Sequence, residues 1–506
     1  MRTRTLLPLS AAAAAALLIA PVRPAPGAAS AARLLGDFTP ETMRVDLLHT
    51  GGKGTEIVAV DRIVSDGPWP GSLSRTDDSL GLGHYRFEVL EPSTGRLLFA
   101  RGYSSIYAEW ETTPEAKTAH RTFRESLRFP WPLRPAQVVL KKRDRQNLFR
   151  EVWQTLVDPA SQDVNPAPPP KLGTVWTVFE NGPPTEKVDL LVLGEGYAAK
   201  DLPKFRADVR RMVDTLFRYE PFKSRKSDFN VRALDLASGG GGAHRPQSKL
   251  FRRTPLQVQY NVFGSERYVL TYDDRSLRDA AAQAPYDAIE ILVNDARYGG
   301  GGIYNHQATA SADTGFAEYV FVHEFGHHFA ALADEYYTSD VAYSDFYPPG
   351  TEPAEANITA LLDPGGLKWR ELVEPGTPVP TPWSKAAFDV AGREYEQRRR
   401  ELNQRIAAAS QAGDPAQEVS GLEQEQELLA QDHTEATRLA LAGETHAGRV
   451  GAFEGAGYAS TGLYRPMLDC LMFRRGVQPF CKVCARAVEE RILLATGSAR
   501  GINVGP

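Results

Sequence analysis

The chain has 506 residues, of which 42% are hydrophobic and 24% are charged. This composition is typical of a globular protein and excludes a disordered or fibrous one. With 58 Lys and Arg against 63 Asp and Glu, the net charge is −5, which argues against nucleic acid or an anionic membrane as the main partner.

Residues 1–31 have the three parts of a secretory signal peptide. Arg2 and Arg4 precede an apolar run over residues 6–20, and small residues follow it. The run is too short for a bilayer-spanning anchor, and no other stretch of the sequence is long and apolar enough. We therefore expect a secreted or periplasmic protein with no stable membrane insertion after signal removal.

Residues 33–162 alternate apolar and polar side chains in short runs, which predicts β-strands. Turn residues then predict hairpins around residues 92–95 and 145–147. The strands are expected at 43–47, 85–89, 97–99, 136–140 and 148–153. This region is predicted to form an N-terminal β-sandwich-like domain. Four prolines within 163–171 predict a stiff linker after it.

From residue 172 to residue 506 the pattern changes to alternating strands and helices, which predicts an α/β domain. Apolar strands are expected at 188–193, 229–236 and 288–293, with an amphipathic helix over 202–219. Residues 388–442 have a different composition, because they are rich in Glu, Gln and Arg and are interrupted by a Gly-Asp-Pro turn. We predict that they form a helical hairpin inserted into this domain.

The sharpest motif is H-E-F-G-H at residues 323–327, at the end of an apolar run that predicts a buried helix. Residues at i and i+4 of a helix differ by about 40° in direction, so His323 and His327 face the same way. This geometry suits two ligands of Zn²⁺. It also places Glu324 beside the metal, where its carboxylate can accept a proton from zinc-bound water.

Asp334 is the expected third zinc ligand, with Glu335 as the alternative. On an unbroken helix Asp334 would lie about 16 Å along the axis from His323, so the helix must end or turn after the second histidine. The metzincin pattern has a glycine seven residues after its first histidine and a ligand ten residues after it. Here those positions hold Ala330 and Ala333, so the strict pattern fails.

Other residues near the motif are expected to have secondary roles. His328 points about 100° away from His327 on a helix, so it is not expected to bind the metal. From spacing alone, Met467 and Met472 are expected to be ordinary core residues. The alternative is that Met472, or else Met467, forms an apolar floor beneath the metal.

The three cysteines are Cys470, Cys481 and Cys484. A zinc ribbon is disfavoured because it needs a second Cys-x-x-Cys pair, and a thioredoxin-like motif lacks its βαβ context. We expect a disulfide that joins Cys470 to one of the other two cysteines.

These features resemble the bacterial IgA-type zinc metallopeptidase family, from about residue 38 to about residue 490. The matching segments are GPWPGS (67–72), LKKRDRQN (140–147), LVLGEGY (191–197), FNVRALDLAS (229–238), HEFGHHFAALADEY (323–336), FEGAGY (453–458), GLYRP (462–466) and FCKVC (480–484). The long zinc segment with the FEGAGY and YRP blocks is far more specific than H-E-x-x-H alone.

The resemblance implies a metzincin-like zinc peptidase domain that has its own N-terminal domain. It implies that His323, His327 and an acid within 333–335 hold zinc and that Glu324 is the general base. It also implies that residues 470–472 supply a Met-turn. The segment 388–442 is not part of the family pattern, and nothing in the sequence encodes antibody recognition.

The predicted function is that of an exported zinc metalloendopeptidase acting on protein or peptide substrates. Tyr464 or Arg465 is expected to help the metal stabilise the oxyanion. The glycines at 299–302, taken alone, are typical of a loop between two elements. The alternative hypothesis is that they and Ile303 form an edge strand along the cleft, which binds substrate by strand addition. The alternatives are an inactive peptidase-fold surface binding protein, which the intact Glu324 argues against, and a zinc amidase acting on a non-protein substrate.

Overall fold

The computed structural model describes residues 36–72, 75–338 and 346–497. The predicted signal peptide, residues 1–31, lies outside the described residues. Apart from Gly36, every described residue belongs to one compact unit, Asp37–Pro506. Within the described part of the chain, no helix has both the length and the apolar character needed to cross a membrane.

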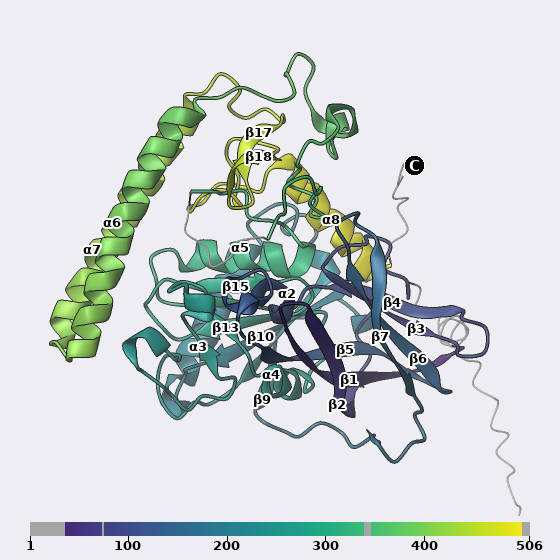
Figure 1. Cartoon of the computed structure of the whole chain (residues 1–506). Helices are drawn as coiled ribbons and strands as arrows, with labels where there is room; N and C mark the ends of the chain where they lie inside the picture. Colours follow the sequence, from purple (N-terminus) through teal and green to yellow (C-terminus); the bar gives the residue numbers. More distant parts are fainter. Residues whose placement is uncertain (1–35, 73–74, 339–345, 498–506) are drawn as a thin grey trace, which may run out of the picture. The chain divides into compact units, whose positions relative to one another are not determined.

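Two four-stranded sheets form the N-terminal region (Figure 1). The first has the order β5-β1-β2-β8 and the second β4-β3-β6-β7. Their strands are β1 (Phe38–Gly52), β2 (Thr55–Pro68), β3 (Tyr85–Leu90), β4 (Leu97–Tyr103), β5 (Arg121–Pro132), β6 (Ala136–Arg143), β7 (Phe149–Val157) and β8 (Val164–Asn165). The rings of Phe87 in β3 and Phe129 in β5 lie 6.2 Å apart between centroids, so the sheets face each other across an aromatic core.

The predicted strand positions agree with this arrangement, but the predicted linker contains a short strand. The hairpin expected around residues 92–95 is confirmed by the antiparallel pairing of β3 with β4. The predicted linker begins differently, because Val164 and Asn165 form β8 and pair in parallel with Ile63 and Val64 of β2. The start of the proline-rich segment is therefore held by backbone hydrogen bonds to the first sheet.

A six-stranded sheet with the order β15-β16-β14-β10-β11-β9 forms the α/β region. Its strands are β9 (Thr174–Phe179), β10 (Val188–Glu195), β11 (Phe229–Asp235), β14 (Ala288–Val293), β15 (Gly300–Ile303) and β16 (Gln307–Ser311). The four inner strands are parallel, and the two edge strands β9 and β15 are antiparallel to their neighbours. All eight residues of β10 are buried, as expected for a strand covered on both faces.

Helices cover both faces of this sheet. Leu190 and Val192 of β10 belong to the core that includes α3 (Leu202–Leu216), α5 (Ala317–Ala330) and α8 (Lys482–Thr496). Leu191 and Leu193 point the other way, into a core that includes α4 (Asp274–Ala281). The two-residue period of the strand thus assigns its side chains to the two layers.

Helices α6 (Lys385–Ala412) and α7 (Ala416–Ala442) run side by side (Figure 1). Gly413 ends α6 in the left-handed region, with a φ of 76°, which glycine adopts without strain. The rings of Tyr395 and His433 stack at 3.9 Å between the two helices. Gln411 Nε2 donates to the carbonyl of Gln247 at 2.8 Å, so the far end of α6 also contacts the α/β region.

A buried charge network joins the N-terminal sheets to the α/β region. The Arg44 side chain in β1 is 1% exposed, and its Nη1 lies 2.5 Å from Asp66 Oδ1. Its Nη2 lies 2.5 Å from Oδ1 of Asp279 in α4. Removing one partner of such a buried network costs about 3–5 kcal/mol, because the remaining charges lose their compensation. The two regions are therefore fastened together by charge as well as by packing.

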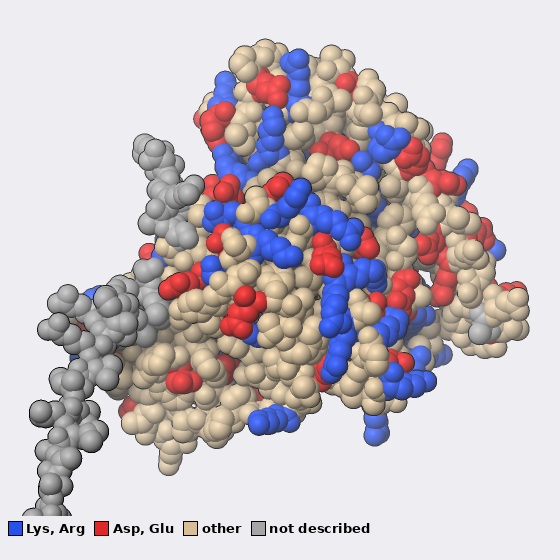
Figure 2. Space-filling model, turned by 180° about the vertical axis from the view of Figure 1, so that it is seen from behind, with Lys and Arg blue, Asp and Glu red and all other residues tan. Residues whose placement is uncertain are grey.

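Acidic and basic side chains are interspersed over the surface. On the face seen in Figure 2, several Lys and Arg side chains gather near the middle, with Asp and Glu side chains among and around them.

His49 is a buried group that should make stability depend on pH. Its Nδ1 lies 2.9 Å from Glu125 Oε1 and its Nε2 lies 3.0 Å from Glu56 Oε1. Burial lowers the pKa of His49, but the two carboxylates more than offset this and raise the pKa to about 9. Protonated His49 therefore contributes stability that is fully present below about pH 6.5 and is lost as pH rises through 9.

We expect the free energy of unfolding to fall by up to about 3 kcal/mol between pH 6.5 and pH 9 because of this group. Thermal unfolding of His49→Gln should lack this component of the pH dependence. The exposed His120→Gln should keep the wild-type profile. Identical pH profiles for wild type and His49→Gln would contradict the assignment.

Candidate metal centre

Helix α5 carries the H-E-F-G-H motif and lies directly against β15 and β16. The close approach depends on glycine in β15, because a methyl group at Gly302 would lie 2.4 Å from the carbonyl oxygen of Glu324. Of the two interpretations of the glycine cluster, a loop or an edge strand, the structure shows an edge strand over Gly300–Ile303. Its glycines allow the helix to approach the sheet closely enough to bring the motif to the sheet edge.

The chain turns back immediately after α5. Ala331 caps the helix in the left-handed region, with a φ of 51°, and its N–H donates to the carbonyl of His327 at 3.1 Å. The N–H of Leu332 donates to the carbonyl of Gly326 at 3.3 Å, which completes a helix-ending turn. This turn falls one residue later than the metzincin glycine position at Ala330. Asp334 is likewise one residue later than the metzincin ligand position, so the turn and the acid are displaced together.

The turn brings Asp334 to the two histidines. His323 Nε2 and His327 Nε2 lie 3.1 Å apart, and Asp334 Oδ1 lies 3.1 Å from the first and 3.3 Å from the second. A tetrahedral zinc ion with ligands at about 2.0–2.1 Å has ligand-to-ligand distances of about 3.3–3.4 Å. Asp334 Oδ1 is also buried without a hydrogen-bond partner among the described residues. The three side chains therefore fit a zinc ion.

Backbone carbonyls orient both imidazoles. His323 Nδ1 lies 3.1 Å from the carbonyl oxygen of Leu471, and His327 Nδ1 contacts that of Leu332. These contacts favour a proton on each Nδ1 and leave each Nε2 free as a ligand atom. The second carboxylate oxygen of the acid accepts a hydrogen bond from Tyr458 at 2.6 Å. Each of the three ligands is thus held by a second contact.

Glu324 lines the same cavity as these ligands, which has a volume of about 200 Å³. Burial raises the pKa of the Glu324 carboxyl above its usual value, and the charges of His323 and His327 oppose this rise. A carboxylate with a raised pKa is better suited to accept and return a proton near neutral pH.

Two neighbours of the ligands point elsewhere. Glu335 Oε1 lies 3.1 Å from Cys484 Sγ and 3.1 Å from Asn357 Nδ2, so it does not join the two histidines. His328 Nε2 accepts from the N–H of Ile289 at 3.0 Å, and its Nδ1 lies 2.9 Å from the carbonyl oxygen of Ile303. His328 therefore bridges α5 to the sheet.

Met472 lies beneath α5. A methyl group at Gly326, between the two histidines, would lie 3.1 Å from Met472 Sδ. The Met472 carbonyl accepts from the N–H of Glu335 at 2.9 Å. Of the two candidate methionines, Met472 is thus the one that contacts the helix beside the ligands.

The expectation for Tyr464 and Arg465 is wrong, because neither is among the described residues that line the cavity. Arg465 is fully buried, and its Nη1 donates to the carbonyl of Gly455 at 2.6 Å. Tyr464 and Arg465 are close in sequence to Met472, but their side chains do not point toward the cavity. Two other polar side chains line the cavity together, since Arg267 Nη2 lies 3.5 Å from the hydroxyl of Tyr336.

The expected disulfide is also absent. All three cysteines are free and buried, and the sulfurs of Cys470 and Cys484 are 3.8 Å apart. A disulfide requires an S–S distance of about 2.05 Å.

The cavity wall draws on three parts of the chain. His84, Ser104 and Glu109 come from the N-terminal region, and Tyr395 and His433 come from α6 and α7. A substrate in this cavity would therefore contact side chains from the N-terminal region and the helix pair as well as from the α/β region.

Gly300→Ala is expected to lower kcat by roughly 10–100-fold, because it displaces Glu324. A methyl group at Gly300 would lie 2.9 Å from Glu324 Oε1 and 2.5 Å from Val320 Cγ1. The bound metal should be retained, because the three atoms nearest to that methyl group belong to Val320 and Glu324 and not to a histidine. Gly239→Ala is the matched control, since its methyl group would come no closer than 3.4 Å to another atom. A Gly300→Ala protein with wild-type kcat would show that the position of Glu324 does not limit the reaction.

Comparison with known proteins agrees with this site. A family model described as IgA Peptidase M64 matches residues 177–492, and a model described as Peptidase M64 N-terminus matches residues 36–154. No curated protein matches the chain. The first model covers more than half of the chain and includes both histidines, Glu324 and Asp334, which confirms the resemblance found in the sequence. The chain belongs to the IgA peptidase M64 family of metallopeptidases, and it is accordingly a peptidase with a protein substrate.

Proposed function

We propose that this protein is an exported, zinc-dependent endopeptidase in which Glu324 is the general base. The main support is the convergence of ligand atoms from His323, His327 and Asp334 within 4.8 Å of one another, in the cavity that Glu324 lines. A bound Zn²⁺ ion supplies a Lewis acid that polarises the scissile carbonyl and lowers the pKa of water toward about 7.

The side chains of the site have separate roles in the proposed reaction. His323 and His327 bind through Nε2, and the carbonyls of Leu471 and Leu332 keep the rings in that orientation. Glu324 accepts a proton from the attacking water and transfers it to the leaving amine. Arg267 and Tyr336, rather than Tyr464 and Arg465, are proposed to stabilise the oxyanion, because both line the cavity and Arg267 Nη2 lies 3.5 Å from the Tyr336 hydroxyl.

The substrate is proposed to bind along β15. All four residues of β15 are in register with β16, and the N–H of Ser311 donates to the carbonyl of Gly299. Because the bonded positions of an antiparallel pair alternate, the backbone groups of Gly300 and Gly302 face away from β16. The N–H and carbonyl of Gly300 are already bonded to Arg267 and Val269. This leaves Gly302, two residues farther along the edge, as the position at which an extended peptide adds to the sheet.

Export rests on the sequence of residues 1–31, with its basic start, apolar run and small-residue segment. We propose that the signal is removed and that the enzyme acts in the periplasm or outside the cell.

Metal removal tests the proposed reaction. The protein treated with a zinc chelator should lose cleavage of an unstructured protein such as casein, and added Zn²⁺ should restore it. A zinc-bound protein that cleaves no peptide bond would favour a binding protein. Cleavage confined to amide bonds of cell-wall or glycan material would favour the amidase.

A further inference from the structure

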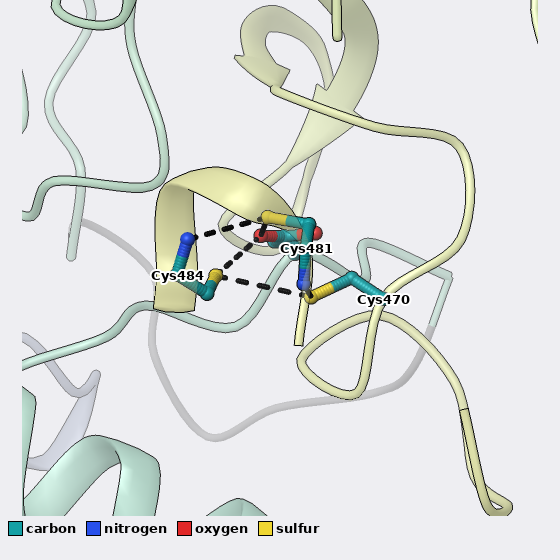
Figure 3. A group of neighbouring side chains, drawn as sticks. Cys470, Cys481 and Cys484 are labelled. Atoms are coloured by element: carbon teal, nitrogen blue, oxygen red, sulfur yellow. Dashed lines mark hydrogen bonds between the residues drawn. The ribbon is translucent and has the colours of Figure 1, made fainter. Parts of the chain in front are cut away.

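A second group of possible metal ligands lies beside the first and is not used by the proposed reaction. It consists of Cys470, Cys481, Cys484 and Glu335, and one ligand atom from each lies within 4.8 Å of the other three. Figure 3 shows the three sulfur atoms gathered in one place, with Cys481 and Cys484 at the start of a helix and Cys470 on a separate loop. All four residues are at most 3% exposed.

The distances fit a tetrahedral metal ion. A tetrahedron with metal–sulfur distances of about 2.3 Å has sulfur-to-sulfur distances of about 3.8 Å. Cys470 Sγ and Cys484 Sγ lie 3.8 Å apart. Glu335 Oε1 lies 3.1 Å from Cys484 Sγ and 3.8 Å from Cys481 Sγ, on either side of the value of about 3.5 Å for a mixed sulfur–oxygen pair. The separation is too long for the disulfide expected from the sequence.

Backbone N–H groups point at the sulfur atoms. The N–H groups of Met472 and Cys481 lie 3.4 and 3.2 Å from Cys470 Sγ, and the N–H of Cys484 lies 3.4 Å from Cys481 Sγ. Hydrogen bonds of this kind stabilise thiolates, the form in which cysteine binds metals. Cys481 is also the N-cap of α8, where the helix dipole favours negative charge.

The group has buried polar atoms that lack partners. Glu335 Oε2 has no hydrogen-bond partner among the described residues, although Glu335 is fully buried. Arg465 is fully buried as well, and its Nε and Nη2 have no partner within the same part of the chain. A carboxylate and three thiolates around a divalent cation leave a net negative charge. The Arg465 guanidinium interacts electrostatically with Glu335 and Cys470, so it can offset this charge.

We propose that Cys470, Cys481, Cys484 and Glu335 bind a second zinc ion, which is structural. Three thiolates select zinc over magnesium or calcium, and four protein ligands leave no open position for substrate. The ion would join Glu335, next to the ligand Asp334, to Cys470, next to Leu471, whose carbonyl contacts His323. It would therefore fix both segments that shape the first metal centre.

Metal counting on the full mature protein tests this proposal. Wild type should contain about two zinc ions per chain, and Cys484→Ser and His327→Ala should each contain about one. Cys484→Ser should also lower the Tm by roughly 5–10 °C. Cobalt-loaded His327→Ala should show a strong thiolate-to-cobalt charge-transfer band in the near ultraviolet, and cobalt-loaded Cys484→Ser should show a weaker one.

Two results would overturn the proposal. One is a Cys470–Cys484 or Cys470–Cys481 disulfide found by peptide mass analysis of the native protein. The other is wild-type protein with about one zinc ion and no thiolate band after cobalt loading, a measurement that needs no variant to fold. Both readouts are independent of the proposed peptidase reaction, because a protein without proteolytic activity would still show the second zinc ion.

Discussion

Glu324→Gln is expected to lower kcat for protein cleavage by at least about 10²–10⁴-fold while the zinc content stays at the wild-type value. The substitution keeps the size of the side chain but removes its ability to accept a proton. Glu324 lies outside the ligand group formed by His323, His327 and Asp334, so the metal should remain bound. The measurement pairs zinc analysis with the initial rate of casein cleavage.

The matched control is Glu318→Gln on the same helix. Glu318 is in the first turn of α5, and its 41%-exposed side chain faces Arg211 and Arg218 at the surface. It changes the helix charge by the same amount and should leave kcat within about twofold of wild type. If Glu324→Gln cleaved casein at the wild-type rate, another group would have to accept the proton.

The strands and helices whose hydrophobic side chains repeat with one regular spacing could be predicted from the sequence. Alternating side chains located the β3–β4 hairpin, and the apolar run before His323 located α5. The i, i+4 spacing within α5 was enough to predict that two imidazoles share one face, because an α-helix fixes that geometry locally.

The turn after α5 could not be predicted in detail. Ala331 adopts a left-handed conformation that usually requires glycine, at a cost of about 1–2 kcal/mol. Surrounding contacts stabilise it, among them the bond from the N–H of Leu332 to the carbonyl of Gly326 and the bond from the N–H of Glu335 to the carbonyl of Met472. The strict metzincin spacing therefore failed at Ala330 even though a turn forms one residue later.

Contacts between segments that are far apart in the chain could not be predicted from the sequence either. Tyr458 donates to Asp334 across 124 residues, and Cys481 lies near Glu335 across 146 residues. The Cys-x-x-Cys pattern alone does not indicate that the Glu335 carboxylate lies beside the three sulfur atoms. The close spacing of Cys470, Cys481 and Cys484 indicates a cysteine cluster, but it does not identify Glu335 as the neighbouring residue.

Asp334→Asn is expected to weaken zinc binding at the catalytic site by more than about 100-fold, because it alters one of three protein ligands. Asn retains one neutral oxygen but lacks the negative charge that compensates the metal. The change should abolish casein cleavage at stoichiometric zinc and leave some activity at high zinc concentration. Competition with a chromophoric chelator measures the affinity, and Asp313→Asn, at an exposed acid, is the matched control.

Comparing Asp334→Asn with Glu335→Gln distinguishes the two candidates for the third zinc ligand. Asp334 Oδ1 lies 3.1 Å from His323 Nε2, whereas Glu335 Oε1 lies 3.1 Å from Cys484 Sγ. Glu335→Gln should therefore leave cobalt bound by the histidines and weaken the thiolate-to-cobalt band. If Glu335→Gln instead removed the metal held by the histidines and Asp334→Asn retained it, Asp334 would not be the third ligand. Glu335 would then be the third ligand of the catalytic metal.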